Sequence, residues 1–215
     1  MDPLTGCVVL LTRDYPETTG IDGKEVEVWL RAPGGRPRPK LDRHLGSAFV
    51  VGRGTTAVLV TAAHVARRMD VEALVSFRRA SGGRAGVTLA KLAGRSRGAL
   101  PWIHHGHADV AAVRLRWVPP SLRRQLLPYE RLHAGARAPD SAEPLLVIGF
   151  PLGLFAEQDF APVIKRAHTA SELVRFYSAD GGGPALCFFV DEAGGHLTAI
   201  VPSHVIRRVV ARAAG

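Results

Sequence analysis

Asparagine is absent from the 215-residue sequence, and cysteine occurs only twice, as Cys7 and Cys187. Without asparagine the chain offers no acceptor for N-linked glycans, and it cannot build a Cys-His-Asn site for cysteine-dependent proteolysis. Two cysteines are too few for a disulfide framework or a zinc knuckle. We therefore expect two buried free thiols.

Long apolar runs are also missing. No stretch approaches the roughly 18 apolar residues that a membrane-spanning helix needs, and the first residues lack the basic segment of a secretory signal peptide. The sequence therefore predicts a cytoplasmic protein with no membrane contact. Hydrophobic residues make up 47% of the chain, which excludes a disordered protein.

Lysine is scarce, because only four of the 28 basic residues are lysines and the arginines are scattered in ones and twos. The net charge of +9 invites a nucleic-acid partner. However, the densest basic segment, residues 31–43, is interleaved with proline and glycine and predicts a solvated loop. No zinc finger, aromatic RNA-binding strand pair or basic helix accompanies it. Nucleic-acid binding through the basic surface is therefore kept only as a third alternative.

What the chain does contain is many short apolar segments separated by glycine and proline, a pattern typical of a β-barrel or sandwich. Strands are expected at residues 8–12, 26–30, 46–52, 58–60, 75–78, 86–92, 110–115, 145–149, 162–166, 186–190 and 197–201. Ser121 is expected to cap a short helix over residues 122–127. A C-terminal amphipathic helix is expected from Ser203, with valines on one face and arginines on the other.

The chain is organised around His64. Residues 46–52 and 58–60 read as two apolar strands joined by a turn, and this hairpin places His64 directly after its second strand. For an isolated histidine, packing at a strand end is the commoner role. Here the flanking segments Gly-Ser-Ala-Phe-Val-Val (46–51) and Val-Thr-Ala-Ala-His-Val (60–65) resemble the catalytic-histidine region of trypsin-like (chymotrypsin-fold) serine peptidases of the compact bacterial type.

Two further segments follow the order of that family. Asp109 precedes the apolar strand 110–115, as the family's Asp-(Val/Ile)-Ala segment does, and residues 149–151 repeat its Gly-(Phe/Tyr)-Pro element. The resemblance implies that His64 is a general base and that Asp109 orients its imidazole. A metal site is the competing interpretation of this stretch, because His104, His105 and His107 lie near Asp109, but the spacing of a zinc motif is missing.

The nucleophile loop departs from the family. Residues 178–186, Ser-Ala-Asp-Gly-Gly-Gly-Pro-Ala-Leu, are similar to its Gly-Asp-Ser-Gly-Gly-Pro loop, and Gly181 falls at the position of the serine. Glycine has no side chain for His64 to activate. The backbone amides of Ala179 and Gly181 would form the oxyanion hole, although alanine replaces the first glycine of the loop. Ser178 is the alternative nucleophile, and Cys187 is expected to be core.

The resemblance runs from about Gly46 onward and implies a mostly β, two-barrel fold with short helices and a C-terminal helix. We expect a single domain over residues 1–215, with a first barrel in 1–118 and a linker, a shortened second barrel and the helix in 119–215. The preferred function is an inactive homologue that binds a peptide or protein in the cleft between the barrels, without cofactor or metal. The alternative is an active serine endopeptidase whose serine has been replaced at Gly181 or is supplied by Ser178.

Overall fold

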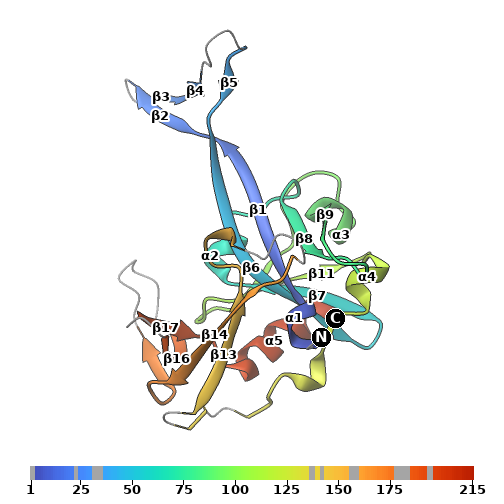
Figure 1. The fold of residues 1–215 in the computed structure, drawn as a ribbon, viewed down its shortest axis with the longest axis vertical. Coiled ribbons are helices and arrows are strands. Elements are labelled where there is room, and N and C mark those ends of the chain that lie inside the picture. The colour runs from blue at the N-terminus through green and yellow to red at the C-terminus, as the bar shows by residue number, and fades with distance from the viewer. Residues whose placement is uncertain are drawn as a thin grey trace.

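The computed structural model describes residues 3–21, 24–30, 36–135, 139–140, 143–154, 160–176, 185–192 and 196–215. The expectation of a mostly β protein with a C-terminal helix is confirmed: two larger antiparallel sheets form the body, and a slender arm extends from it (Figure 1). Among the described strands no sheet closes into a barrel. No described helix is long and apolar enough to cross a membrane.

The first sheet has the order β10-β11-β7-β6-β1-β8-β9 and contains most of the strands expected in the first half of the chain. Its strands are β1 (Val8–Pro16), β6 (Leu41–Arg53), β7 (Thr56–Thr61), β8 (Leu74–Arg78), β9 (Arg84–Thr88), β10 (Ile103–His104) and β11 (Ala111–Leu115), and β12 (Leu127–Pro128) pairs with β6 in parallel. The β6–β7 hairpin that was expected to deliver His64 is present.

The central strand β7 is buried on both faces, which explains its unbroken β-branched and leucine sequence. Ala57 and Leu59 face one core cluster, while Val58 and Val60 face a second cluster on the other side of the sheet. This second cluster is completed by α5 (Ser203–Ala214), whose Val205, Val209 and Val210 are fully buried. The C-terminal helix therefore packs on the first sheet through the apolar stripe that its sequence predicts.

The second sheet lies beside the first and has the order β13-β14-β16-β15, with β17 also paired to β16. Its strands are β13 (Pro144–Gly149), β14 (Val163–Thr169), β15 (Val174–Phe176), β16 (Ala185–Glu192) and β17 (His196–Ile200). Its core is small, with Ala167, Phe188 and Val190 at the centre. The expected strands of the second half are confirmed, and β15 was not anticipated.

The arm corrects two expectations about residues 26–43. It consists of two short hairpins, β2 (Thr18–Ile21) with β3 (Lys24–Glu27) and β4 (Trp29–Leu30) with β5 (Arg38–Pro39). The expected strand at 26–30 is thus interrupted at Val28. The expected loop at 31–43 is wrong for residues 38–39 and 41–43, which belong to β5 and β6, and residues 31–35 lie outside the described ranges.

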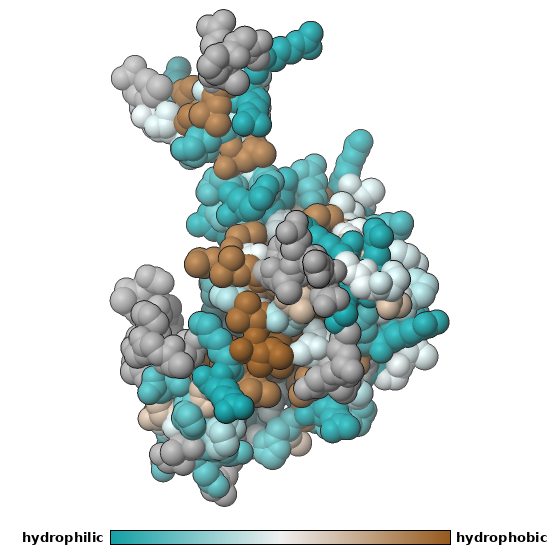
Figure 2. Space-filling model, viewed as in Figure 1, coloured by the Kyte–Doolittle hydropathy of each residue, from teal (hydrophilic) through white to brown (hydrophobic). Residues whose placement is uncertain are grey.

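The break at Val28 has a clear cause. Where β1 and β6 separate, Glu17 donates its N–H to the carbonyl of Lys40, Val28 donates to Glu17, and Lys40 donates to Val28, each at 2.7 Å. This closed ring of three backbone hydrogen bonds, with a Lys40–Glu17 ion pair of 2.8 Å, joins three strand pairs at one point. The arm also exposes apolar side chains (Figure 2), namely Val26, Trp29, Leu30 and Leu41.

Two helix expectations also need correction. Residues 89–92 were expected to continue a strand but form α3 (Leu89–Ala93), because Thr88 caps the N-terminus and Gly94 ends the helix in a left-handed conformation. The expected helix at 122–127 is shorter, α4 (Pro120–Arg123), and starts at a proline rather than after a capping Ser121. The other short helices in the described ranges are α1 (Pro3–Gly6), α2 (Ala63–Ala66), η1 (Tyr129–Arg131) and η2 (Pro151–Gly153).

The burial of His204 on α5 is expected to make folding sensitive to mild acid. Its side chain is buried, and burial followed by the charge of Arg208 lowers its pKa, while a backbone hydrogen bond with Gly135 acts in the opposite direction. Because the unfolded histidine keeps a pKa of about 6.5, the unfolded chain binds more protons than the folded chain below that pH. The free energy of unfolding should therefore fall as the pH decreases from about 7 to about 5.

We predict that His204→Gln reduces this loss of stability. Urea unfolding at the two pH values measures the loss, and His105, whose pKa burial also lowers, provides a second contribution. The double variant with His105→Gln should show a smaller loss than either single variant. Equal pH dependence in all four proteins would contradict this assignment.

Candidate functional site

The pairing of β7 with β11 brings His64 and Asp109 together. The two strands are antiparallel, with Thr61 opposite Ala111, so the residues that follow β7 lie beside those that precede β11. His64 is three residues after Thr61, on the short helix α2 (Ala63–Ala66), and Asp109 is two residues before Ala111. The 45-residue separation in sequence is therefore bridged by a single strand pair.

Asp109 holds His64 by two contacts. Its Oδ2 lies 2.6 Å from the imidazole Nδ1, and its Oδ1 accepts the backbone N–H of His64 at 2.9 Å. The carboxylate accepts but cannot donate, so Nδ1 carries the proton in the neutral ring and Nε2 presents a lone pair. Because Ala62 offers no side-chain cap to α2, the backbone contact also lets Asp109 serve as the cap of this helix.

Both side chains are open to solvent: 68% of the His64 side chain and 46% of the Asp109 side chain are exposed. No described residue forms a hydrogen bond with Nε2 of His64. The imidazole is thus fixed at one nitrogen and accessible at the other, which is the arrangement that a general base requires toward an incoming group.

Small residues allow α2 to lie close to the sheet. Ala63 and Ala66 pack against Ala111 of β11, with Trp102 at the edge of this cluster. The indole N–H of Trp102 donates to the carbonyl of Met69 at 3.2 Å and so ties down the chain that follows the helix.

On the other side, Gly46 of β6 faces Val65. A Cβ atom at position 46 would overlap the side chain of Val65, so the close contact between β6 and α2 depends on this glycine. The helix that carries His64 is therefore held between β6 and β11.

The Gly-Phe-Pro element is attached to the same part of β6. The Oγ of Ser47 accepts the backbone N–H of Phe150 at 2.7 Å, and the carbonyl of Ser47 accepts the hydroxyl of Thr61 at 2.8 Å. Phe150 is buried and stacks on Phe160 with 5.1 Å between ring centroids. Ser47 therefore links the end of β7 to the turn that leaves the second sheet.

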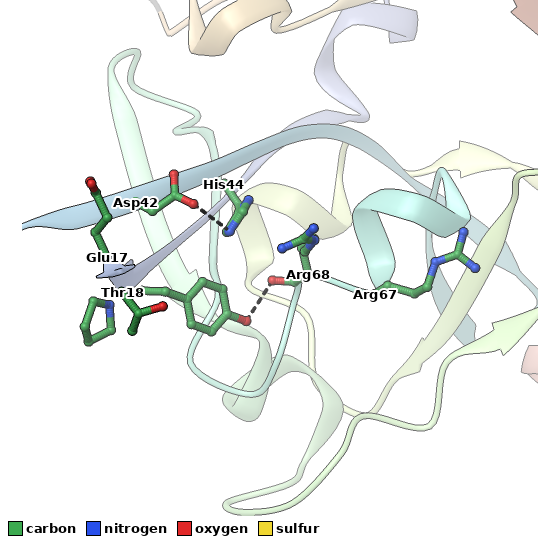
Figure 3. Close-up of a pocket in the computed structure, with 8 residues that line it drawn as sticks. Glu17, Thr18, Asp42, His44, Arg67 and Arg68 are labelled. Atoms are coloured by element: carbon green, nitrogen blue, oxygen red, sulfur yellow. Dashed lines mark hydrogen bonds and ion pairs between the residues drawn. The ribbon is translucent and has the colours of Figure 1, made fainter. Parts of the chain in front are cut away.

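A depression of about 290 Å³ lies next to α2, where the arm leaves the body (Figure 3). Arg68, four residues after His64, extends toward it, and the hydroxyl of Tyr15 donates to the carbonyl of Arg68 at 2.9 Å. His44 and Asp42 on β6 form an ion pair of 3.4 Å on its other wall. The depression is lined by Tyr15, Pro16, Glu17, Thr18, Asp42, His44, Arg67 and Arg68.

Of the residues expected from the sequence, the structure brings His64 and Asp109 together. Gly181, Ala179 and Ser178 lie outside the described residues. Cys187 is buried in β16, and burial raises the pKa of its thiol, so it is core as expected and poorly suited to act as a nucleophile.

The metal alternative receives no support from the geometry. His104, His105 and His107 do not gather with Asp109, because within the described ranges no three histidine, cysteine or carboxylate side chains are grouped to hold a metal ion.

The roles of Ser47 and Trp102 and the depression beside α2 were not predicted from the sequence. Ser47 acts through a contact with Phe150, 103 residues away, and the depression forms only because β1 and β6 diverge into the arm. Such contacts depend on strand pairing rather than on local pattern.

Comparison of the chain with protein-family models gives no match, and comparison with curated protein sequences gives none either.

Proposed function

We propose that the chain is a homologue of trypsin-like serine peptidases that binds a peptide or protein segment beside His64 and Asp109 without cleaving it. The observation that carries the proposal is the double contact of Asp109 with the imidazole Nδ1 and the backbone N–H of His64. Gly181 at the expected nucleophile position is the reason to propose binding without acyl transfer, since no side chain there can attack a carbonyl.

The exposure of Asp109 supports a non-catalytic role. In an active Ser-His-Asp site the aspartate is buried, which strengthens its interaction with the imidazolium. Here almost half of the Asp109 side chain is exposed, so water screens its interaction with the imidazole.

The finer architecture that we propose is the two-barrel fold, with the first sheet in the first barrel and the second sheet in a shortened second one.

The depression beside α2 supports an extended ligand. It begins within one helical turn of His64 and continues to the base of the arm, so a bound segment that passes His64 would meet Arg68 and Tyr15 next. Hydrogen-bonding groups and an aromatic ring along such a path suit an unfolded segment better than a compact small molecule.

Reduced and carboxymethylated lactalbumin, which is unfolded, tests this function. We expect the chain to bind it in a sedimentation or interferometry measurement, to ignore native lactalbumin, and to create no new N-termini. New N-termini that disappear with His64→Ala would instead identify an active peptidase. Equal binding of the folded and unfolded forms would also contradict the proposal.

A further inference from the structure

A second group of chemically active side chains lies on α5, apart from His64. His204, Arg208 and Arg212 follow one another at intervals of four residues and therefore share one side of the helix. This side borders a depression of about 300 Å³ whose lining is Tyr129, Ala134, His204, Arg207, Arg208 and Ala211. The helix packs against β7, β10 and β11 of the first sheet (Figure 1), so it is a rigid support.

Two of the nearby arginines are already engaged. Arg207 donates to the carbonyls of Leu132 at 2.6 Å and Tyr129 at 3.3 Å, and Arg53 donates to the carbonyl of Ala211 at 3.2 Å. Both guanidinium groups also lie over the ring of Tyr129, at 4.3 and 5.0 Å from its centroid. These contacts fix one wall of the depression.

Arg208 and Arg212 have no such role. Both are exposed, and within the described ranges no carboxylate forms an ion pair with either of them. Their positive charges affect the two nearby histidines. Burial is the larger cause of the lowered pKa of His204 and of His105, and the charge of Arg208 lowers both further. Arg212 adds to the effect on His105. A cationic cluster that has no counter-charge within the described part of the chain is the expected complement of an anion.

His204 provides an independent sign of a missing partner. Only 8% of this residue is exposed, and its Nδ1 is buried with no well-aligned hydrogen-bond partner among the described residues, although the backbone of Gly135 lies near the ring. A buried polar atom of this kind costs free energy unless something satisfies it. Because Nδ1 itself is buried, the His204 side chain must turn toward the depression before a protonated Nδ1 can donate to an oxygen of an anion held by Arg208.

His105 extends the cluster from a different element. Its Nδ1 accepts the backbone N–H of His107 at 3.2 Å, so the neutral ring carries its proton on Nε2 and offers a donor there. His105 follows β10, whereas His204 and Arg208 belong to α5. The charges of Arg208 and Arg212 act on His105, so it lies near this side of α5, and a phosphate, which has several acceptor oxygens, suits donors on two separate elements.

We propose that the depression beside α5 is a binding site for a phosphate group, held by Arg208 and His204 with His105 next to them. The site is separate from the His64–Asp109 pair and does not depend on the proposed peptide binding. The phosphate can come from free phosphate or from the backbone of a nucleic acid, and the two sources share the chemistry that the cluster recognises.

Calorimetric titration of the full chain with inorganic phosphate, at constant ionic strength and pH 6.5, tests the site. We expect one saturable site with a Kd on the order of 1 mM. Arg208→Ala should weaken it at least about tenfold, because it removes a charge-assisted bidentate donor. The matched control is Arg79→Ala, which removes the same charge from the exposed turn between β8 and β9, at the opposite edge of the sheet.

A second titration with a short single-stranded oligonucleotide distinguishes the sources. Oligonucleotide binding that Arg208→Ala weakens and Arg79→Ala does not would place the phosphate on a polymer, and binding of inorganic phosphate alone would make free phosphate the ligand. No saturable binding of either probe, or equal losses in Arg208→Ala and Arg79→Ala, would overturn the proposal, since the effect would then be one of net charge only.

Discussion

In a chain that carries Gly181→Ser, replacing Asp109 by asparagine is expected to slow labelling by a fluorophosphonate by roughly 10²-fold, the lower end of what a positioned general base contributes, because water screens the half-exposed Asp109. Asparagine can turn its NH₂ group toward Nδ1 of His64, which then places the ring proton on Nε2. A protonated Nε2 cannot accept the proton of a serine hydroxyl. The substitution also weakens the contact that Asp109 makes with the backbone N–H of His64.

The control for this prediction neutralises a different carboxylate, one that lines the depression beside α2. Asp42→Asn neutralises a partner of His44 in the depression beside α2 and leaves the 2.6 Å contact of His64 untouched. Its labelling rate should stay close to that of the parent chain. Similar losses in the two variants would mean that the local negative charge matters and the orientation of His64 does not.

Gly46→Ala is expected to destabilise the fold by about 1–3 kcal/mol, as overpacked positions in protein cores generally do. The new Cβ would overlap Val65, whose branched side chain has essentially one rotamer available in a helix. The strain can be relieved only by moving α2, so His64 should move with it. Urea unfolding measures the free-energy change.

Gly20→Ala is the matched control, because its Cβ would meet no heavy atom within 4 Å. It should be neutral or slightly stabilising. Adding Val65→Ala to Gly46→Ala should recover part of the loss, and the double-mutant cycle would then give a favourable coupling between the two positions. If Gly46→Ala and Gly20→Ala unfold at the same urea concentration, the close contact of β6 and α2 does not constrain the helix.

The His64 hairpin and the position of Asp109 were predictable because both depend on short-range patterns. A strand that is buried on both faces reads as a continuous apolar run, and residues 57–60 fit this description. The carboxylate at the start of the next apolar strand then meets the histidine through one antiparallel pair. In contrast, residues 89–92 have an apolar spacing compatible with strand or helix, and only the caps at Thr88 and Gly94 decide for a helix.

The arm could not be predicted, for a different reason. Proline and glycine in residues 31–39 indicate a break in regular structure, but they do not indicate that three strand pairs meet at Glu17, Val28 and Lys40. The junction is made by backbone groups of Glu17, Val28 and Lys40, and backbone hydrogen bonds leave little trace in the sequence. Ser47 was missed for another reason: its side-chain Oγ accepts the N–H of Phe150, but that partner is 103 residues away in the sequence.

The cluster on α5 lies between these cases. Arg208 and Arg212 were expected from the sequence on the solvent face of an amphipathic helix, whereas His204 was not singled out. Only the fold shows that His105 lies close enough for the charges of this helix to affect it, and that one nitrogen of His204 is buried without a partner.

The most direct test of the account is covalent labelling by a fluorophosphonate, measured in parallel on the chain as it stands, on Gly181→Ser and on Gly181→Ser with His64→Ala. We expect no labelling of the first, labelling of the second and its loss in the third, because only a serine activated by its base reacts. Labelling of the unchanged chain would assign the nucleophile to another residue, with Ser178 the first candidate. No labelling of Gly181→Ser would show that His64 and position 181 do not form one site, and the relation to serine peptidases would then fail.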